Sequence, residues 1–349
     1  MRLLSAVALA VGVHFLVSAC LIQRAVRSKK RKADLKKKFP YPVTKIAHRG
    51  GSLLGPENTL YTFTRAVEEG FCDMIELDVR ESKDGQVVVS HDSQLEITCG
   101  SPYAGVAVSD LVVGKDPSET LPQCKRIMEL EFPTSDIMQY EASEDTPVDD
   151  TTRVCLLREV LDKFPSTPLH IDIKDASKDF VAVVLDLIAA YGRESITFVG
   201  SSELQNQQFI NAYFAERGIE VQKRYRIFAG HLDFFRTYLY FYTGILPYLS
   251  LNYDVFSIPV FTRAMKVYAA RKYGKVVAHI GGFLFSSPLL WRYLQSRGIA
   301  VVGWNFNSEV DILEAIQWPI NGVMSDDPIK LHQVIEMNKG AIGLNVLTG

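Results

Sequence analysis

The sequence lacks the patterns that mark several common classes of protein. Its five cysteines are scattered, with no Cys-x-x-Cys pair and no zinc-ligand spacing, so neither a disulfide framework nor a zinc centre is indicated. It has no Asn-x-Ser/Thr sequon, no Gly-x-Gly-x-x-Gly and no P-loop motif, which argues against a glycoprotein and a nucleotide-binding sheet. The net charge of −2 gives no reason to expect nucleic acid, and no protein partner can be inferred.

The N-terminal end of the chain differs from the rest. Residues 3–22 are apolar over roughly the 20 residues that a bilayer-spanning helix needs, and residues 24–38 hold nine Lys/Arg and a single Asp. This order predicts a transmembrane anchor in residues 1–23 and a basic juxtamembrane linker in residues 24–42. The alternatives are a cleaved signal peptide and a lipoprotein cleavage box at Ser18-Ala19-Cys20. In both of these signals the basic residues precede the apolar run, whereas in this chain they follow it.

The basic block also predicts an orientation. Lys and Arg next to an apolar helix stay on the cytoplasmic side and attract anionic lipid. We therefore expect a single-pass protein whose larger part faces the cytoplasm, with membrane lipid as a partner. The endoplasmic reticulum or another internal membrane is the expected location.

From residue 45 onward, β-type runs alternate with helix-like segments. Such alternation over this length predicts an α/β fold, either a TIM-type (β/α)8 barrel or an open doubly wound sheet, and the missing phosphate loops favour the barrel. Residues 93–150 are poorly periodic and are predicted to be an inserted loop or small subdomain. We expect the barrel domain over residues 43–335 and a C-terminal tail over residues 336–349.

Residues 74–92, MIELDVRESKDGQVVVSHD, predict two strands joined by a tight Asp-Gly turn. Alternation along the first strand places Glu76 and Asp78 together on one face and its apolar residues on the other. With this turn, His91 falls opposite Asp78. Burying two carboxylates requires compensation, and a divalent cation bound by oxygen ligands is the simplest form. The alternative is the solvated face of an antiparallel sheet.

Further polar residues follow other apolar strands at their C-terminal ends. Barrel enzymes place their chemistry at this end of the strands, so the shared position predicts one site. The residues are His48, Arg49, Asp172, Lys174, Ser201, Trp304 and Asn305, and Trp304 is included among the candidate site residues.

Seven motifs occur in an order that resembles one enzyme family. They are HRGG, PENTLYTF, IELDV, KDGQVVVSHD, IDIK, GWNFN and GVMSDDP, within residues 45–331. In this order they resemble the glycerophosphodiester phosphodiesterase family, and the apolar start resembles its eukaryotic membrane-anchored branch, whose members are lysophospholipase D enzymes. The resemblance implies a TIM-type barrel and a divalent cation, Mg²⁺ or Ca²⁺.

The resemblance also implies roles for residues that handle protons and phosphate. His48 and His91 match the acid–base pair of the family. Arg49 matches a phosphate-binding arginine, and Lys174 matches a lysine near the phosphate.

The implied metal ligands are carboxylates. Glu76 and Asp78 match ligands of the family, and the predicted place of His91 beside Asp78 also allows it to bind the metal. Asp172 stands where many members have Glu, and this shorter side chain leaves open whether it binds directly or through water. Glu57 matches a position that hydrogen-bonds the loop after the first strand.

These implications predict a metal-dependent phosphodiesterase that releases the headgroup alcohol from lysophospholipids, giving lysophosphatidic acid through a cyclic phosphate. Alternatives are a phosphodiesterase giving glycerol 3-phosphate from soluble glycerophosphodiesters, a sphingomyelinase-D-like enzyme, and an inactive membrane-attached barrel that serves as a scaffold. The aromatic residues 232–262 favour a lipid substrate, because Tyr and Phe prefer the headgroup zone, and are predicted to form a membrane-interfacial segment.

Overall fold

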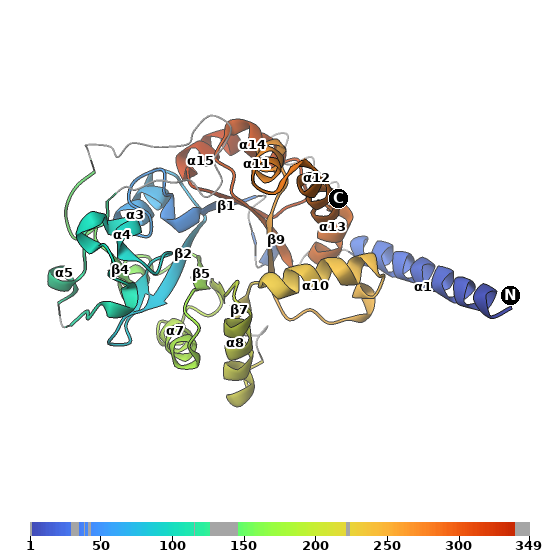
Figure 1. Ribbon diagram of the computed structural model, residues 1–349, viewed down its shortest axis with the longest axis horizontal. Helices are drawn as coiled ribbons and strands as arrows, with labels where there is room; N and C mark the ends of the chain where they lie inside the picture. The colour runs from blue at the N-terminus through green and yellow to red at the C-terminus, as the bar shows by residue number, and fades with distance from the viewer. Residues whose placement is uncertain are drawn as a thin grey trace.

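The computed structural model describes residues 2–28, 35–37, 39–40, 43–114, 116–125, 146–220 and 224–338. Eight parallel strands pair in the order β7-β6-β5-β2-β1-β10-β9-β8 (Figure 1). A parallel bridge between Phe228 and Val255 joins the two ends of this order, so the predicted TIM-type barrel is confirmed. The barrel strands are β1 (Thr44–Ala47), β2 (Met74–Glu81), β5 (Leu169–Ile173), β6 (Thr197–Gly200), β7 (Arg226–Ile227), β8 (Val255–Pro259), β9 (Ala300–Trp304) and β10 (Gly322–Ser325).

A helix follows each strand and covers the outside of the barrel. Several of these helices begin after a side-chain N-cap, such as Thr59, Ser177, Ser287 and Ser308, which satisfies N–H groups that a helix start leaves unpaired. The helices are α3 (Leu60–Glu68), α6 (Leu157–Lys163), α7 (Lys178–Ala190), α8 (Leu204–Glu216), α10 (His231–Tyr242), α13 (Pro288–Ser296), α14 (Glu309–Ala315) and α15 (Pro328–Met337).

Strand β2 shows how the lumen of the barrel acquires its charge. Its alternate apolar residues point outward into the core between barrel and helices, so Glu76 and Asp78 point inward, where both are buried. Below them the lumen is filled by an apolar cluster that includes Ile46, Met74, Phe198, Phe228, Val302 and Met324. The charged layer therefore lies towards the C-terminal ends of the strands, where barrel enzymes hold their sites.

Part of the predicted basic linker belongs to the barrel. Leu35 and Phe39 are buried in the apolar cluster of the lumen, and the Phe39 ring lies 5.1 Å from that of Phe198. The folded domain therefore begins before residue 43, because these two side chains close the apolar end of the lumen. Residues 29–34, which hold much of the basic block, lie outside the described residues.

The predicted insertion packs on the side of β2. The short strands β3 (Val87–Val89) and β4 (Cys155–Leu156) extend the sheet there, and a small apolar cluster, which includes Leu95, Val108 and Leu121, covers them. Residues 115 and 126–145 of the insertion lie outside the described part of the chain. Its described elements are α4 (Leu95–Cys99), η2 (Ser101–Tyr103), η3 (Val108–Asp110) and α5 (Pro117–Thr120).

The aromatic residues 232–262 do not form one unit. They include nearly all of α10, then the turn with η4 (Leu246–Tyr248), and then strand β8. Phe256 and Ile258 of β8 are buried, so the interfacial prediction is wrong for this last part, which is barrel wall. Helix α10 exposes apolar residues such as Phe235 and Leu239, so it remains the candidate for the membrane-interfacial segment.

The N-terminal helix α1 (Arg2–Val26) projects from the side of the barrel (Figure 1). Within the described ranges it is the one helix that is long and apolar enough to cross a membrane. Its base is docked on the barrel: His14 Nε2 lies 2.9 Å from the carbonyl oxygen of Thr243, Ser18 donates to the carbonyl of Gly244, and Ile22 is buried. At the other end of the chain, α15 ends at Met337, and residues 339–349 of the predicted tail lie outside the described residues.

Candidate active site

The turn after β1 presents the first two site residues. His48–Gly50 form a short 3-10 turn in which Arg49 has φ +49°, followed by Gly50 at +78° and Gly51 at +88°. A non-glycine residue in this left-handed region is strained, and such strain is concentrated at functional sites. The turn aims the Arg49 backbone N–H at Glu76 Oε2, 2.7 Å away, and leaves the side chains of His48 and Arg49 at the C-terminal end of the barrel.

Gly50→Ala is expected to destabilise the protein more than Gly192→Ala. Both glycines have positive φ, +78° and +63°, so each alanine incurs a left-handed backbone cost of about 1–2 kcal/mol. A Cβ at Gly50 would also lie 2.3 Å from the Phe63 ring, whereas a Cβ at Gly192 meets open space. The midpoint of thermal unfolding should therefore fall further for Gly50→Ala, and equal shifts would contradict this packing of the turn.

One cavity of about 240 Å³ lies at the C-terminal ends of the strands. Nine of the eleven predicted site residues line it: His48, Arg49, Glu76, Asp78, His91, Asp172, Lys174, Trp304 and Asn305. Of the other two, Glu57 accepts two hydrogen bonds of 3.2 Å from the Arg49 guanidinium, and the buried Ser201 hydroxyl donates to the Ile173 carbonyl at 2.6 Å. The structure thus brings together residues that are up to 257 positions apart in the sequence, from His48 to Asn305.

A buried carboxylate directly after the last strand holds His48 in place. The Nδ1 atom of His48 lies 2.6 Å from Asp326 Oδ1, and Asp326 also accepts hydrogen bonds from Ser52 and Asn307. Burial alone would lower the pKa of His48, but the charges of Asp326 and Glu76 outweigh it and raise the pKa to about 9. Its Nε2 lies 3.9 Å from Glu76, so one ring nitrogen is fixed and the other is available for acid–base chemistry.

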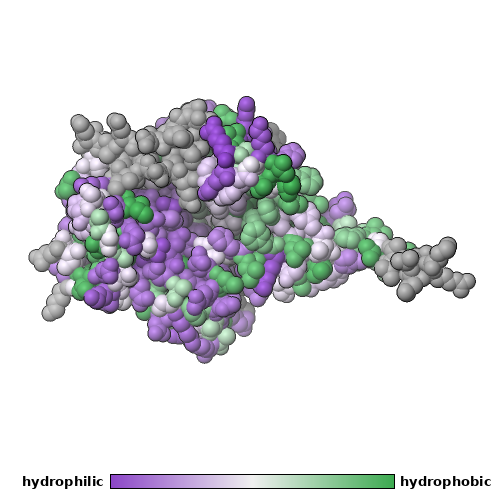
Figure 2. Space-filling view, in the orientation of Figure 1, coloured by the Kyte–Doolittle hydropathy of each residue, from purple (hydrophilic) through white to green (hydrophobic). Residues whose placement is uncertain are grey.

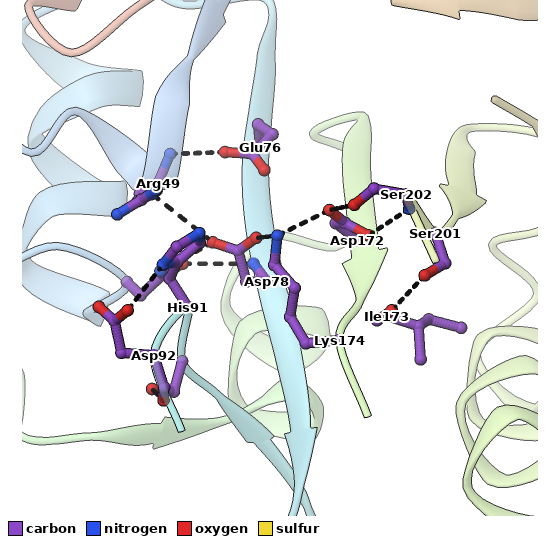
Figure 3. A network of polar contacts seen from close by, with 12 residues as sticks. Arg49, Glu76, Asp78, His91, Asp92, Asp172, Ile173, Lys174, Ser201 and Ser202 are labelled. Carbon is purple, nitrogen blue, oxygen red and sulfur yellow. Dashed lines mark hydrogen bonds and ion pairs between the residues drawn. The ribbon is translucent and has the colours of Figure 1, made fainter. Parts of the chain in front are cut away.

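Glu76 and Asp78 form a buried acidic pair (Figure 3). Burial, followed by the charge of Asp78, raises the pKa of Glu76 to about 7. Burial acts on Asp78 as well, but the positive charges of Lys174, His91 and Arg49 outweigh it and lower the pKa. The negative charge of Glu76 is therefore less well balanced by neighbouring positive charges than that of Asp78. A bound cation would stabilise the charged form of such a buried carboxylate.

Lys174 lies between two acidic strands (Figure 3). Its Nζ is 3.0 Å from Asp78 Oδ1 and 2.8 Å from Asp172 Oδ2. Burial alone would lower the pKa of Lys174, but both carboxylates outweigh it and raise the pKa, so the ammonium stays charged. Asp172 also accepts a hydrogen bond of 3.2 Å from the Ser202 hydroxyl, so its carboxylate already has two partners within the protein.

A second group of possible ligands lies at the rim. Glu57, His91 and Asp92 each offer a ligand atom within 4.8 Å of the others, and this is the group of three that the described residues provide. It shares only His91 with the predicted ligand set. Glu57 is paired with Arg49 at 3.2 Å, and His91 Nδ1 lies 3.2 Å from Asp92 Oδ1. These possible metal ligands therefore already have partners within the protein.

The two strands predicted within residues 74–92 pair as expected, but their register is shifted by one residue. Val79 pairs with Val89, and Ser90 N–H donates to the Asp78 carbonyl at 3.0 Å, so Ser90 rather than His91 stands opposite Asp78. The cause is a loop of three residues, 83–85, closed by Ser82 N–H donating to the Gln86 carbonyl, where the prediction assumed a two-residue turn. His91 still reaches the cavity from the residue after the pair.

Three residues that shape the cavity are not predicted from the sequence. Asn58 donates a hydrogen bond of 3.2 Å to Asp78, Asp326 holds His48, and His170 is buried against the Phe228 ring at 4.3 Å. Asn58 and Asp326 lie in the PENT and SDDP motifs, which are a usable signal. Strand alternation places His170 with the inward residues of β5, but it says nothing of what the ring contacts.

Comparisons with known proteins agree with this geometry. Residues 48–227 match the Glycerophosphoryl diester phosphodiesterase family. The chain is 31% identical over 307 residues to "Lysophospholipase D GDPD1" of Mus musculus, covering 86% of this chain and 88% of that protein. It is 26% identical over 293 residues to "Lysophospholipase D GDPD3" of Homo sapiens, covering 83% and 84%.

Solved structures share the fold at low sequence identity. The glycerophosphodiester phosphodiesterase of Thermotoga maritima has a TM-score of 0.53 and 20% identity, covering 84% of this chain and 98% of that chain. The enzyme of the same description from Agrobacterium tumefaciens has a TM-score of 0.53 and 17% identity, covering 83% and 99%.

Two imidazoles, a guanidinium and buried carboxylates meet at the mouth of a closed parallel barrel, and with the family match this site is that of a phosphodiesterase. The chain belongs to the glycerophosphoryl diester phosphodiesterase family, which confirms the resemblance drawn from its motifs. Members of this family generally depend on a divalent metal ion, and the acidic residues of the cavity and its rim offer oxygen ligands for one.

Proposed function

We propose that the chain is a lysophospholipase D, which releases the headgroup alcohol of a lysophospholipid and leaves lysophosphatidic acid. The observation that carries the proposal is the meeting of His48, His91, Arg49 and an acidic pair at one cavity. It occurs in a chain 31% identical to a lysophospholipase D over most of its length.

Two cations of the chain are suited to bind the phosphate. The Arg49 guanidinium lines the cavity and is positioned by Glu57, and a guanidinium can contact two oxygens of a phosphodiester at once. Lys174 also lines the cavity, 2.8 Å from Asp172, and adds a second positive charge. Together they offset the negative charge that otherwise repels a nucleophile.

We assign the metal ion to Glu76 and Asp78 rather than to the rim group. Glu76 is buried and incompletely compensated, whereas Glu57 of the rim group is already paired with Arg49. Carboxylate oxygens suit Mg²⁺ and Ca²⁺, and such an ion, when bound, acts as a Lewis acid and lowers the pKa of a bound hydroxyl. Asp172 serves instead as the partner of Lys174.

The two histidines supply the proton transfers. In a lysophospholipid the free glycerol hydroxyl lies next to the phosphate, so its attack is intramolecular and is favoured by proximity. One imidazole takes the proton of this hydroxyl, and the other gives a proton to the departing headgroup alkoxide. A cyclic phosphate results, and water then opens the ring to lysophosphatidic acid.

A lipid substrate is favoured by the surroundings of the mouth. Helix α10 begins at His231, which lines the cavity, and continues through exposed Phe235, Leu239 and Tyr242 to the base of α1. We infer that α1 crosses a bilayer, with the barrel on the cytoplasmic side of it. An acyl chain could then follow α10 between membrane and cavity.

The test is choline release by the full chain from lysophosphatidylcholine and from glycerophosphocholine, with and without EDTA. We expect faster release from the lysolipid, loss of release with EDTA, and recovery on addition of Mg²⁺ or Ca²⁺. Faster release from glycerophosphocholine would instead indicate a soluble substrate. Absence of release from both would indicate an inactive scaffold.

The same assay tests the internal attack. A lysophosphatidylcholine whose free glycerol hydroxyl is methylated cannot form the cyclic phosphate, so we expect it to release no choline. Release at the full rate would show that water attacks the phosphate directly.

A further inference from the structure

The connection between β8 and β9 carries two helices more than the barrel requires. Helix α13 already fills the place of the covering helix, with Leu290, Trp291 and Leu294 buried against the barrel. Before it come α11 (Arg263–Tyr273) and α12 (Lys275–Phe285), which turn at Gly274 and pack together. We call these two helices the hairpin.

Helix α12 exposes most of its apolar side chains. Val276, Ile280 and Phe283 are 72%, 52% and 77% exposed, and their spacing of four and three residues places them on one side of the helix. Only Ala278 and Gly282 of α12 are buried. Monomeric soluble proteins seldom leave such a continuous apolar surface in water, so this surface requires a partner. The apolar stripe consists of Val276, Val277, Ile280, Phe283 and Leu284.

The hairpin is also basic. Residues 263–285 contain five Lys/Arg and no Asp or Glu, and all five cations are exposed. An apolar stripe flanked by cations is the composition of helices that lie in the surface of an anionic bilayer. A second copy of the chain fits less well, because it would bring two sets of like charges together. The basic residues are Arg263, Lys266, Arg271, Lys272 and Lys275.

The hairpin is joined to the N-terminal helix through α10. The hydroxyl groups of Tyr238 and Tyr242 on α10 donate to the carbonyls of Phe285 and Leu284, at 2.7 and 2.5 Å. The C-terminal end of α10 then meets α1 at Thr243. In Figure 1 helix α12 of the hairpin lies towards the side from which α1 projects. Figure 2 shows hydrophobic residues gathered towards that side of the molecule, whereas the opposite side of this face is mostly hydrophilic.

We propose that the hairpin is a membrane-binding element that lies on an anionic phospholipid surface, and we call this contact seating. Its apolar stripe enters the boundary between headgroups and acyl chains, and its Lys and Arg residues contact lipid phosphates. The proposal rests on the proposed anchoring by α1 and not on the choice of substrate. With both contacts in place, α10 and the rim of the cavity are held close to the lipid surface.

Tryptophan quenching by brominated phosphatidylcholine tests this placement. The full chain is reconstituted in vesicles with phosphatidylserine, as Phe283→Trp, as Val276→Trp, and as the control Val310→Trp, which replaces a 64% exposed valine on α14. We expect bromine to quench the added emission at position 283 or 276 about twofold or more above that at 310, because only the stripe enters the acyl region.

Charge neutralisation provides the second arm of the test. Each Lys or Arg near an anionic surface is worth about fivefold in affinity, so Arg271→Gln, Lys272→Gln and Lys275→Gln together should weaken seating of the hairpin by about a hundredfold. Quenching of Phe283→Trp should then fall in vesicles with phosphatidylserine.

Flotation with the vesicles separates the possible failures. A chain that does not float overturns the anchoring and the seating together. A chain that floats but shows equal quenching at positions 283, 276 and 310 overturns the seating alone, and leaves the proposed anchoring and activity untouched.

Discussion

His48→Asn and His91→Asn are each expected to lower choline release from lysophosphatidylcholine by about 10²–10⁴-fold, the usual contribution of general acid–base catalysis. Both imidazoles line the cavity, and one turnover needs a proton to be removed and another to be supplied. The matched control is His332→Asn on α15, a histidine beside Lys45 at the start of β1. This control should retain the full rate of release.

A second substrate separates the roles of the two histidines. A lysophosphatidic acid ester of 4-nitrophenol has a leaving group that departs without a proton, so the variant that lacks the general acid should recover most of its rate on this ester. The variant that lacks the general base should remain slow. Recovery of both variants, or of neither, would contradict the division of proton transfer between His48 and His91.

Glu76→Gln and Asp78→Asn are expected to lower the rate by about 10²–10³-fold, the effect of losing one preorganised electrostatic group. Each change removes an oxygen charge from the buried pair, so the Mg²⁺ or Ca²⁺ concentration that gives half-maximal activity should also rise. In Asp78→Asn the positive charge of Lys174, 3.0 Å from that carboxylate, additionally loses a partner.

Asp92→Asn provides the comparison for the metal requirement. Asp92 belongs to the rim group with Glu57 and His91, so its loss should leave the half-maximal metal concentration unchanged if the ion lies at Glu76 and Asp78. A larger shift for Asp92→Asn than for Glu76→Gln would move the ion to the rim group.

Much of the site could be predicted because barrel strands follow simple geometry. Alternation along β2 sends its apolar residues to the outer core, so Glu76 and Asp78 had to share the lumen. Parallel strands that close a barrel bring their C-terminal ends to one rim. Residues after β1 and β5, such as His48 and Lys174, therefore meet at one cavity.

The remaining features depend on contacts that no local pattern encodes. Asp326 and His48 are 278 residues apart, and strand alternation does not show which side chain meets that imidazole. Lys174 lies between Asp78 and Asp172 because two neighbouring strands present carboxylates at matching positions, so Asp172, predicted as a possible metal ligand, faces an ammonium.

The predicted start of the barrel domain and the predicted end of the interfacial segment differ from the structure for the same reason. Leu35 and Phe39 lie after a basic run in the sequence, yet they fill the apolar end of the lumen. Strand β8 follows an aromatic helix, and its composition resembles the residues before it, although Phe256 and Ile258 are barrel wall. Composition describes a segment, whereas burial depends on the rest of the fold.

The position of a bound Mn²⁺ ion tests most directly whether the acidic pair and both imidazoles surround one cation. Crystals of the full chain grown with Mn²⁺ should give an anomalous peak about 2.0–2.6 Å from carboxylate oxygens of Glu76 and Asp78, on the cavity side of His48 and His91. A peak between Glu57 and Asp92, with none at the acidic pair, would contradict the assignment.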